Sequence, residues 1–254
     1  MGGAILGGLI SSGAVKRRGA AGFDSDPAKC AAARRRYAIR VSGLEAVAHC
    51  DIVIIAVKPQ NMDEVLRAIS LYGKDRLYIS IAAGITTARI EKALGARPRV
   101  IRVMPNTPAL IGEGISALCR GRYATAKDLK AADEIFSSVG ETANIGERYF
   151  DLVTAVSGSG PAYFFYLNEA LIETAVGMDM DRAIAKRLVS KTAFGSAKLL
   201  MKSGCAPEEL RRRVTSKGGT TEQAIKVFER SGMKGIVAKA VKAAAKRSRQ
   251  LSEG

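Results

Sequence analysis

The strongest constraint on the fold is the alternation of short apolar runs with helical stretches in the first half of the chain. The runs DIVIIAV (51–57), RLYISIAA (76–83) and RVIRVM (99–104) are rich in β-branched residues and lack strict polar alternation. This pattern is typical of strands buried on both faces. Helical stretches at 60–72 and 86–94 separate the runs. The spacing predicts right-handed βαβ units and therefore a parallel sheet.

Two further strands are predicted nearer the start, at RGAAGFD (18–24) and AIRV (38–41). The segment between them predicts a helix from Pro27 to Tyr37, for which Asp26 and Pro27 form a suitable N-cap and first-turn pair. The first half of the chain is therefore expected to be one α/β domain.

The second half shows no strand pattern after about residue 149. The stretch GPAYFFYLNEALIETAVGM (160–178) predicts a helix that is apolar almost all round, which requires burial in a helical core or a subunit interface. Further helices are predicted at 181–202, 207–215, 220–231 and 233–251. The sequence thus predicts an α/β domain over 1–148 and an all-α domain over 149–254.

The formal net charge is +16, and the two halves share it equally. Residues 1–150 carry 22 Lys and Arg against 14 Asp and Glu, and residues 151–254 carry 18 against 10. Nucleic-acid-binding proteins usually concentrate basic residues on one face, whereas a spread excess fits a protein that handles small anions. We therefore expect no nucleic-acid partner.

The sequence gives little support for a metal site, a membrane-spanning segment or catalysis by histidine. The four cysteines are scattered without C-x-x-C spacing, and His49 is the only histidine, so no metal site is expected and His49 is interpreted as structural. No apolar run is long enough to cross a bilayer, and the start of the sequence lacks a secretory pattern. A cytoplasmic location without a membrane partner is the expectation.

Small, polar or rigid residues follow three successive predicted strands, in AVKP (56–59), SIAAGIT (80–86) and MPNTP (104–108). Ligands of open α/β sheets bind at the carboxyl ends of the strands. Lys58 at that edge suits a phosphate or a ribose, and two prolines hold Asn106 in a stiff loop. Three such strand ends together predict a ligand site.

The stretch MGGAILGGLI predicts a helix from Gly2 to Ser12 whose glycines permit close packing. In a dinucleotide-binding fold the last glycine of G-x-G-x-x-G lies at such a helix start, and an acidic residue ending the second strand contacts the adenosine ribose. Asp24 lies at that position. A simple turn residue is an equally good interpretation of Asp24.

A second candidate site lies in LRRRVTSKGGTTEQAI (210–225). Thr220 followed by Gln223 has the spacing of a capping box, and free N–H groups around 219–221 would bind an anion at the helix start. From this stretch alone, a capped helix start without a ligand is the favoured interpretation.

Six stretches, taken in order, resemble the landmarks of the pyrroline-5-carboxylate reductase family along nearly the whole chain. They are MGGAILGGLI, AVKPQ, AAGIT, RVMPNTP, SGSGPAY and VTSKGGTTEQAI. The last resembles the family signature V-[ST]-S-P-G-G-x-T. The resemblance implies a Rossmann-like parallel-sheet domain that binds NADPH or NADH, followed by an all-α dimerisation domain that forms a homodimer or a higher homo-oligomer.

The resemblance also implies hydride transfer to the imine of 1-pyrroline-5-carboxylate, the last step of proline synthesis. It assigns the dinucleotide to nine positions: Met1, Gly2, Asp24, Ala56, Val57, Lys58, Pro59, Ala83 and Asn106. The substrate is assigned to Ser216, Gly219, Thr220 and Thr221, of which the first three suit its carboxylate. Of these, Thr221 is the catalytic candidate, because its hydroxyl can hydrogen-bond the ring nitrogen.

Some positions depart from the family pattern. Lys217 replaces the signature proline, Arg212 and Arg213 stand where an Asp-Asn pair is usual, and Gly43 replaces a ribose-contacting asparagine. An arginine there could alter cofactor choice. Met1 and Gly2 match the end of the family's G-x-G-x-M loop, so we expect the natural chain to begin about ten residues earlier, the length of a strand plus a turn.

Three alternatives remain open at the level of sequence. The first is a binding protein that keeps the fold without catalysis. The second is another Rossmann reductase with a helical second domain, such as a β-hydroxyacid dehydrogenase, although its helix-borne lysine motif has no match around 160–200. The third is a nucleic-acid-binding protein, which the net charge alone motivates.

Overall fold

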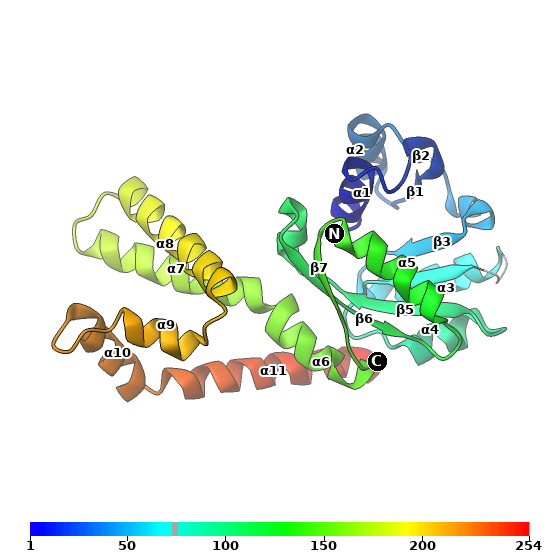
Figure 1. Ribbon diagram of the computed structural model, residues 1–254. Coiled ribbons are helices and arrows are strands. Elements are labelled where there is room, and N and C mark those ends of the chain that lie inside the picture. Colours follow the sequence, from blue (N-terminus) through cyan, green and yellow to red (C-terminus); the bar gives the residue numbers. More distant parts are fainter. Residues whose placement is uncertain (73–75, 254) are drawn as a thin grey trace. The chain divides into compact units, whose positions relative to one another are not determined.

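The structure, a computed structural model, describes residues 1–72 and 76–253 (Figure 1). The chain forms two compact units: the first combines Met1–Ser159 with the segment from Ala243 onward, and the second is Gly160–Lys242. The division at residue 148 stays a prediction about domain boundaries. By contacts, the residues up to Ser159 and the end of the last helix belong with the α/β unit.

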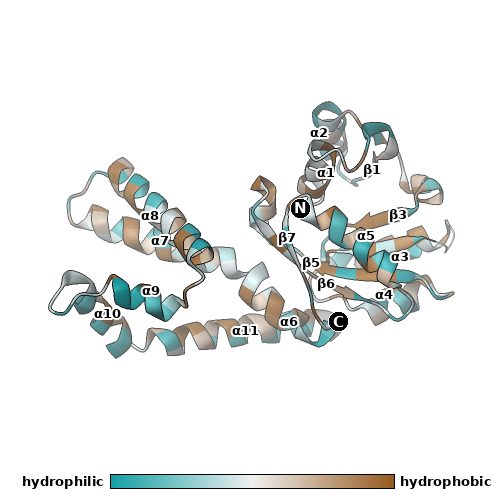
Figure 2. Ribbon diagram, in the orientation of Figure 1, coloured by the Kyte–Doolittle hydropathy of each residue, from teal (hydrophilic) through white to brown (hydrophobic). Residues whose placement is uncertain are grey.

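A five-stranded sheet in the order β3-β4-β5-β6-β7 forms the centre of the first unit (Figure 1). The strands β3 (Ile52–Ile55), β4 (Leu77–Ser80) and β5 (Arg99–Met104) are parallel neighbours, as their apolar runs predict. Figure 2 shows β3 in the colour of hydrophobic residues. All four residues of β4 are buried, which confirms that this strand is covered on both faces.

The predicted parallel sheet is confirmed, with one antiparallel pair that the sequence does not indicate. Strand β6 (Gly114–Arg120) runs antiparallel to β5, and β7 (Gly140–Asn144) is then parallel to β6. Only the short 3-10 helix η4 (Thr107–Ile111) connects β5 to β6. A parallel crossover needs a dozen or more connecting residues, so this short link leaves only the antiparallel arrangement.

The two early strands are shorter than predicted and form a sheet of their own. Strand β1 (Ala21–Gly22) pairs in parallel with β2 (Arg40–Val41), and α2 (Pro27–Tyr37) connects them. The expected cap of α2 is confirmed, since the backbone N–H of Ala28 donates to Asp26 Oδ1 at 2.9 Å. Three 3-10 turns complete this region: η1 (Arg17–Gly19), η2 (Leu44–His49) and η3 (Pro59–Asn61).

Helices cover both faces of the five-stranded sheet. On one face α3 (Met62–Ser70) and α4 (Thr87–Leu94) pack on residues such as Tyr78 and Val100. On the other face α1 (Gly2–Ser11) and α5 (Ala126–Ser137) pack on residues such as Ile79 and Ile101. Alternate residues of one strand therefore enter two separate cores, which makes the unit three layers thick.

The glycines of α1 allow the close packing that the sequence predicts. A Cβ added at Gly8 would lie 2.5 Å from Val139 Cγ1 and 2.7 Å from the carbonyl oxygen of Ser138. Ile5 and Leu9 are buried on the same side of the helix. The helix is therefore part of the core and not a surface element.

The second unit is helical. It holds α7 (Gly160–Gly177), α8 (Arg182–Ser203), α9 (Pro207–Arg213), α10 (Thr220–Arg230) and the first part of α11 (Met233–Glu253), each within three residues of its predicted bounds. The turns η5 (Glu147–Tyr149), α6 (Phe150–Val153) and η6 (Thr154–Gly158) precede it. The described part of the chain contains no helix long and apolar enough to cross a membrane.

Candidate active site

The register of the parallel strands brings the predicted dinucleotide positions to one sheet edge. Ile55 pairs with Ser80, and Ser80 pairs with Arg102, so the three strands end side by side. The segments that follow them carry Ala56, Ala83 and Asn106. Carboxyl ends of parallel strands are where open α/β sheets bind ligands. The structure thus places the segments after β3, β4 and β5 side by side at one edge of the sheet.

The start of α1 lies beside the end of β3. A Cβ added at Gly2 would lie 3.0 Å from the Cβ of Ala56. The N–H groups of Ala4 and Ile5 donate to the carbonyl oxygen of Met1. Those of Gly2 and Gly3 have no acceptor among the residues that the structure describes. Open N–H groups at the positive end of a helix dipole fit the pyrophosphate of a dinucleotide.

The four residues after β3 divide between the core and the surface. Val57 packs against the core beneath α3 and α4, while Ala56 and Lys58 are exposed. Pro59 begins η3, and the N–H of Asn61 donates to the carbonyl oxygen of Lys58 at 3.0 Å. The small side chain of Ala56 leaves the backbone of this turn open to a ligand.

Asp24 has one oxygen in a turn and one oxygen free for a ligand. Its Oδ1 accepts the N–H of Asp26 at 3.0 Å and lies 3.8 Å from Lys29 Nζ. Its Oδ2 has no hydrogen-bond partner within residues 1–72 and 76–253. The turn and the ribose interpretations are therefore compatible, because a single carboxylate can serve both.

Asn106 has a structural role that the sequence does not show. Its Oδ1 accepts the N–H of Ile115 at 3.0 Å, and its Nδ2 donates to Ser157 Oγ at 3.4 Å. The amide therefore joins the start of β6 to the turn η6. A contact between Asn106 and the cofactor stays a prediction. The hydrogen bonds to Ile115 and Ser157 already use part of the capacity of the amide group.

The prediction of a capping box at Thr220 is wrong, because the N-cap of the helix is the glycine one residue earlier. Gly219 is the N-cap of α10, and no side chain caps it. The Glu222 carboxylate instead accepts the N–H of Gly218 at 2.8 Å, and the N–H of Gly219 donates to the Ser216 carbonyl oxygen at 3.1 Å. The hydrogen bond from Gly218, with a smaller contribution from Lys226, lowers the pKa of Glu222 below its ordinary value.

The anion site predicted at this helix start is therefore displaced. Gly219 offers no free N–H, but the N–H groups of Thr220, Thr221 and Glu222 have no acceptor among the described residues. A Cβ added at Gly219 would lie 2.5 Å from Ser216 Oγ, so the Ser216 side chain folds back over the loop. Thr221 is half-buried, and its hydroxyl has no hydrogen-bond partner in the described part of the chain.

The arginines before this loop differ in their contacts. Arg213 forms an ion pair with Glu209 on the same helix, and Arg211 lies 3.5 Å from Glu229 on α10. Arg212 is exposed and forms no ion pair with any described residue. Of the two arginines that replace the usual Asp-Asn, only Arg212 is thus available to a ligand.

The described residues contain no group of three or more His, Cys, Asp and Glu side chains that could hold a metal ion. Burial raises the pKa of the Cys119 thiol to about 12, with a further contribution from Glu147, which disfavours the reactive thiolate form.

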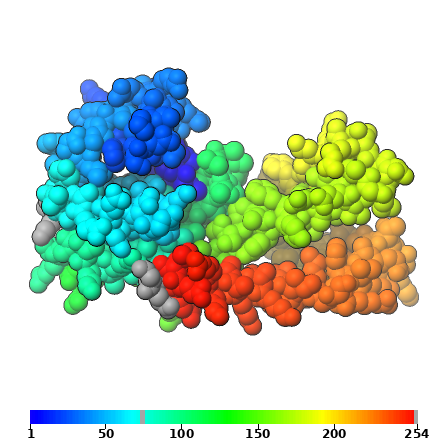
Figure 3. Space-filling view, turned by 180° about the vertical axis from the view of Figure 1, so that it is seen from behind, coloured from blue at the N-terminus to red at the C-terminus, as the bar shows by residue number. Residues whose placement is uncertain are grey.

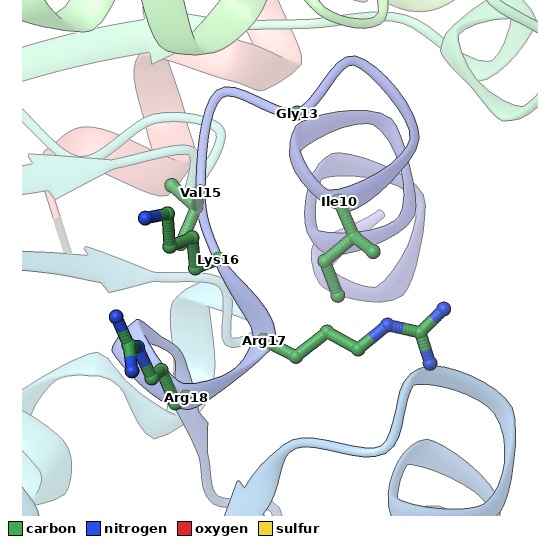
Figure 4. Close-up of a pocket in the computed structure, with 6 residues that line it drawn as sticks. All are labelled: Ile10, Gly13, Val15, Lys16, Arg17 and Arg18. Carbon is green, nitrogen blue, oxygen red and sulfur yellow. The ribbon is translucent and has the colours of Figure 1, made fainter.

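A basic depression lies at the far end of α1 from Gly2. It has a volume of about 510 Å³ and is lined by Ile10, Gly13, Val15, Lys16, Arg17 and Arg18. Figure 4 shows that the three basic side chains point in different directions and do not converge on one point. Residues 16–40 hold eight Lys and Arg against two Asp, so the positive charge of the first half is less evenly spread than the count by halves indicates.

The comparisons with known proteins agree with this geometry. Residues 1–84 match the family described as NADP oxidoreductase, coenzyme F420-dependent, and residues 147–251 match pyrroline-5-carboxylate reductase dimerisation. The first unit therefore contains a Rossmann-like domain that uses NADPH or NADH, as predicted. Solved prephenate dehydrogenases, at 17% identity and a TM-score of 0.55, share the fold alone.

Relatives named pyrroline-5-carboxylate reductase match this chain over most or all of its length. A pyrroline-5-carboxylate reductase of Methanosarcina acetivorans is 40% identical over all of this chain and 95% of its own length. One from Pseudomonas aeruginosa is 44% identical over 84% of this chain and 78% of its own. The crystal structure of a Plasmodium falciparum pyrroline carboxylate reductase with NADP bound matches with a TM-score of 0.90 and 31% identity, over 99% of this chain and 94% of that one. The chain belongs to the pyrroline-5-carboxylate reductase family.

Proposed function

We propose that this protein reduces the cyclic imine of 1-pyrroline-5-carboxylate to proline, using NADPH or NADH. The observation that carries the proposal is the start of α10, where three N–H groups and the Thr221 hydroxyl lie together without partners among the residues that the structure describes. A substrate with one carboxylate and one ring nitrogen needs an anion site next to a hydrogen-bond donor. This loop supplies both within three residues.

Each polar group of the loop has a part in binding. The N–H groups of Thr220 and Thr221, together with the Ser216 hydroxyl, hold the carboxylate at the positive end of the α10 dipole. The Thr221 hydroxyl donates a hydrogen bond to the ring nitrogen. As the hydride reaches the imine carbon, the nitrogen takes up one proton through this hydroxyl, which water replaces, and becomes the amine of proline. The hydrogen bond orients the ring and draws electron density from the imine carbon, so that the carbon is more electrophilic.

The dinucleotide has its own set of residues in the first unit. The N–H groups of Gly2 and Gly3 suit the pyrophosphate, and Asp24 suits the adenosine ribose. Ala56 and Ala83 present small side chains at the strand ends, which lets a flat ring lie against the backbone. A bound nicotinamide supplies the hydride, and the chain itself supplies orientation and a suitable electrostatic environment.

The direct test is to mix the protein with 1-pyrroline-5-carboxylate and NADPH or NADH and to follow the loss of nicotinamide absorbance. We expect turnover with formation of proline. A protein that binds dinucleotide but shows no turnover with either cofactor would instead be a binding protein that keeps the fold.

Asp24 is expected to disfavour the 2′-phosphate of NADPH. Asp24→Asn keeps the acceptor for the Asp26 N–H and removes the charge. We expect this variant to raise the ratio of kcat/KM for NADPH over NADH about tenfold, the equivalent of about 1.4 kcal/mol. Steady-state kinetics with both cofactors measure the ratio.

Asp26→Asn is the matched control, because asparagine is also a good N-cap and the charge removed lies only two residues away. Its ratio should stay within about twofold of the parent, since surface charges in water interact weakly. Equal shifts in the two variants would mean that Asp24 does not contact the ribose.

The second unit is proposed to form the interface of a homodimer. Phe165 and Tyr166 on α7 are 67% and 74% exposed in the single chain, although the helix is mostly apolar (Figure 2). Exposed apolar patches of this kind mark interfaces, and a second copy is the partner that the dimerisation match favours. We expect light scattering at micromolar concentration to give at least the mass of a dimer.

Phe165→Glu should shift the protein to the monomer, because an unpaired charge would be buried at the interface. The control is Leu71→Glu, which changes a side chain of the first unit that is 80% exposed and should leave the mass unchanged. A monomeric parent protein would overturn the proposal.

A further inference from the structure

An ion-pair cluster outside the candidate site surrounds the half-buried carboxylate of Glu147. Its Oε1 accepts the N–H of Thr87 at 2.8 Å and Arg102 Nη1 at 3.1 Å, and its Oε2 accepts the Thr87 hydroxyl at 2.8 Å. Arg102 lies on the central strand β5 and is 3% exposed. Its guanidinium also stacks over the ring of Phe150 at 4.6 Å. Every hydrogen bond in this cluster ends on the same carboxylate.

Stability alone does not explain the cluster. The desolvation of the buried Arg102 guanidinium largely offsets its attraction to the Glu147 carboxylate, whose side chain is 30% exposed, so the pair adds little net stability. The cluster does fix a geometry. Thr87 is the first residue of α4, after the N-cap Thr86, so the Glu147 carboxylate lies at the positive end of this helix and binds its first free N–H group.

The loop that leads into Thr87 is the one that follows β4 and carries Ala83. On its other side, Gly84 contacts the end of α11. Gly84 has φ of +75°, and a Cβ there would lie 2.8 Å from Leu251 Cβ and 3.1 Å from the Ser248 carbonyl oxygen. Figure 3 shows the last turns of α11, in red, lying against the α/β unit. The loop 81–86 is therefore confined between two elements.

Both elements are held by one short segment. Asp151 lies four residues after Glu147, and its Oδ1 accepts the hydroxyl of Ser248 at 2.7 Å. Glu147 thus fixes the α4 end of the loop directly. Asp151 fixes the α11 turn that packs on Gly84. The segment 147–151 determines the position of the loop from both sides.

We infer that Glu147 is a positioning residue, which sets the backbone of loop 81–86 where the nicotinamide ring of the bound dinucleotide lies. The inference rests on the proposed cofactor role of Ala83. A displacement of less than 1 Å in this loop would move the ring away from the geometry needed for hydride transfer, and misplacement on that scale can cost about 100-fold in rate.

The test uses Thr87→Val, which keeps the shape of the side chain and removes one hydrogen bond to Glu147. We expect the Kd for NADH to rise about fivefold and kcat to fall by a similar factor, as for a small misplacement of the ring. The emission of the bound reduced nicotinamide should also shift. The chain contains no tryptophan, so no energy transfer from tryptophan contributes to this emission.

Two variants separate positioning from general stability. Thr87→Ser retains the hydroxyl and should restore Kd, kcat and emission to within about twofold of the parent. Thr125→Val is the matched control, since the Thr125 hydroxyl also donates to a carboxylate, that of Asp128, at the start of a helix. It should lower the melting temperature as Thr87→Val does and leave nicotinamide binding unchanged.

Equal effects of Thr87→Val and Thr125→Val on Kd and emission would overturn the inference. The inference would also be overturned if Thr87→Val raised the KM for the imine substrate by as large a factor as the KM for the dinucleotide. The NADH titration does not depend on turnover, so it gives a result even if the parent protein fails to reduce 1-pyrroline-5-carboxylate. A separate Ala83→Val variant with unchanged NADH binding would refute the proposed role of Ala83 itself.

Discussion

Replacing Thr221 by alanine is expected to lower kcat about 100-fold or more, the lower end of what a positioned proton donor contributes to a reaction. The hydroxyl is half-buried and has no partner in the described part of the chain, so nothing within the chain competes for its hydrogen bond. No other hydroxyl of the α10 start occupies the same position. Steady-state kinetics with saturating dinucleotide measure the loss.

Thr221→Ser supplies the control for this prediction. Serine keeps the hydroxyl and should retain most of the activity, whereas alanine should not. Binding of NADH should be nearly the same in both variants, because the dinucleotide residues belong to the first unit and Thr221 belongs to the second. An alanine variant with the parent's kcat would show that the ring nitrogen is bound by another group.

The largest effect on stability is expected from Gly140→Ala. Gly140 has φ of +144°, and its partner across the β6–β7 ladder is Gly114. A Cβ at position 140 would overlap the carbonyl oxygen of Gly114 and lie 2.5 Å from its nitrogen. Backbone atoms cannot rotate aside as a side chain can. We expect a loss of more than about 4 kcal/mol in the free energy of unfolding, in the range reserved for severe steric changes.

Gly146→Ala is the matched substitution, since it lies in the same unit with φ of −67°. A Cβ there would make only ordinary contact, 3.9 Å from Tyr149 Cδ2. Its effect should stay within about 1 kcal/mol. Thermal unfolding followed by circular dichroism, at one protein concentration, compares the two variants. Similar midpoints would show that β7 can shift away from β6 without cost.

The apolar pattern predicts those elements whose burial is nearly complete. Strand β5 and helix α2 have the predicted bounds, and helices α7 to α11 differ from theirs by a few residues. The sequence does not predict strand β7, because its residues GETAN are mostly polar. This segment forms a strand through its pairing with β6. Strand β6 begins at a glycine and carries small residues, so its β-propensity is weak without its neighbours.

The candidate site shows a similar limit. The strand-end residues were predictable because parallel strands end at one edge. The sequence predicts a capping box at Thr220, but the N-cap is Gly219. Glu222, three residues after Gly219, therefore accepts a hydrogen bond from the loop, in place of the predicted Gln223. The contact between Glu147 and Thr87 joins residues 60 positions apart. No local pattern encodes such a contact, and only the folded chain shows it.

The end of α11 has a consequence for the order in which a newly made chain can fold. Protein domains generally fold as units during synthesis, from the N-terminal side first. Here the five strands are complete at Asn144, yet Gly84 and Asp151 acquire their partners only with Ser248 and Leu251. The ribosome makes the entire second unit before it makes those residues. The first unit to emerge is therefore the last to be finished, and its loop 81–86 reaches its final packing only after the helical unit has been made.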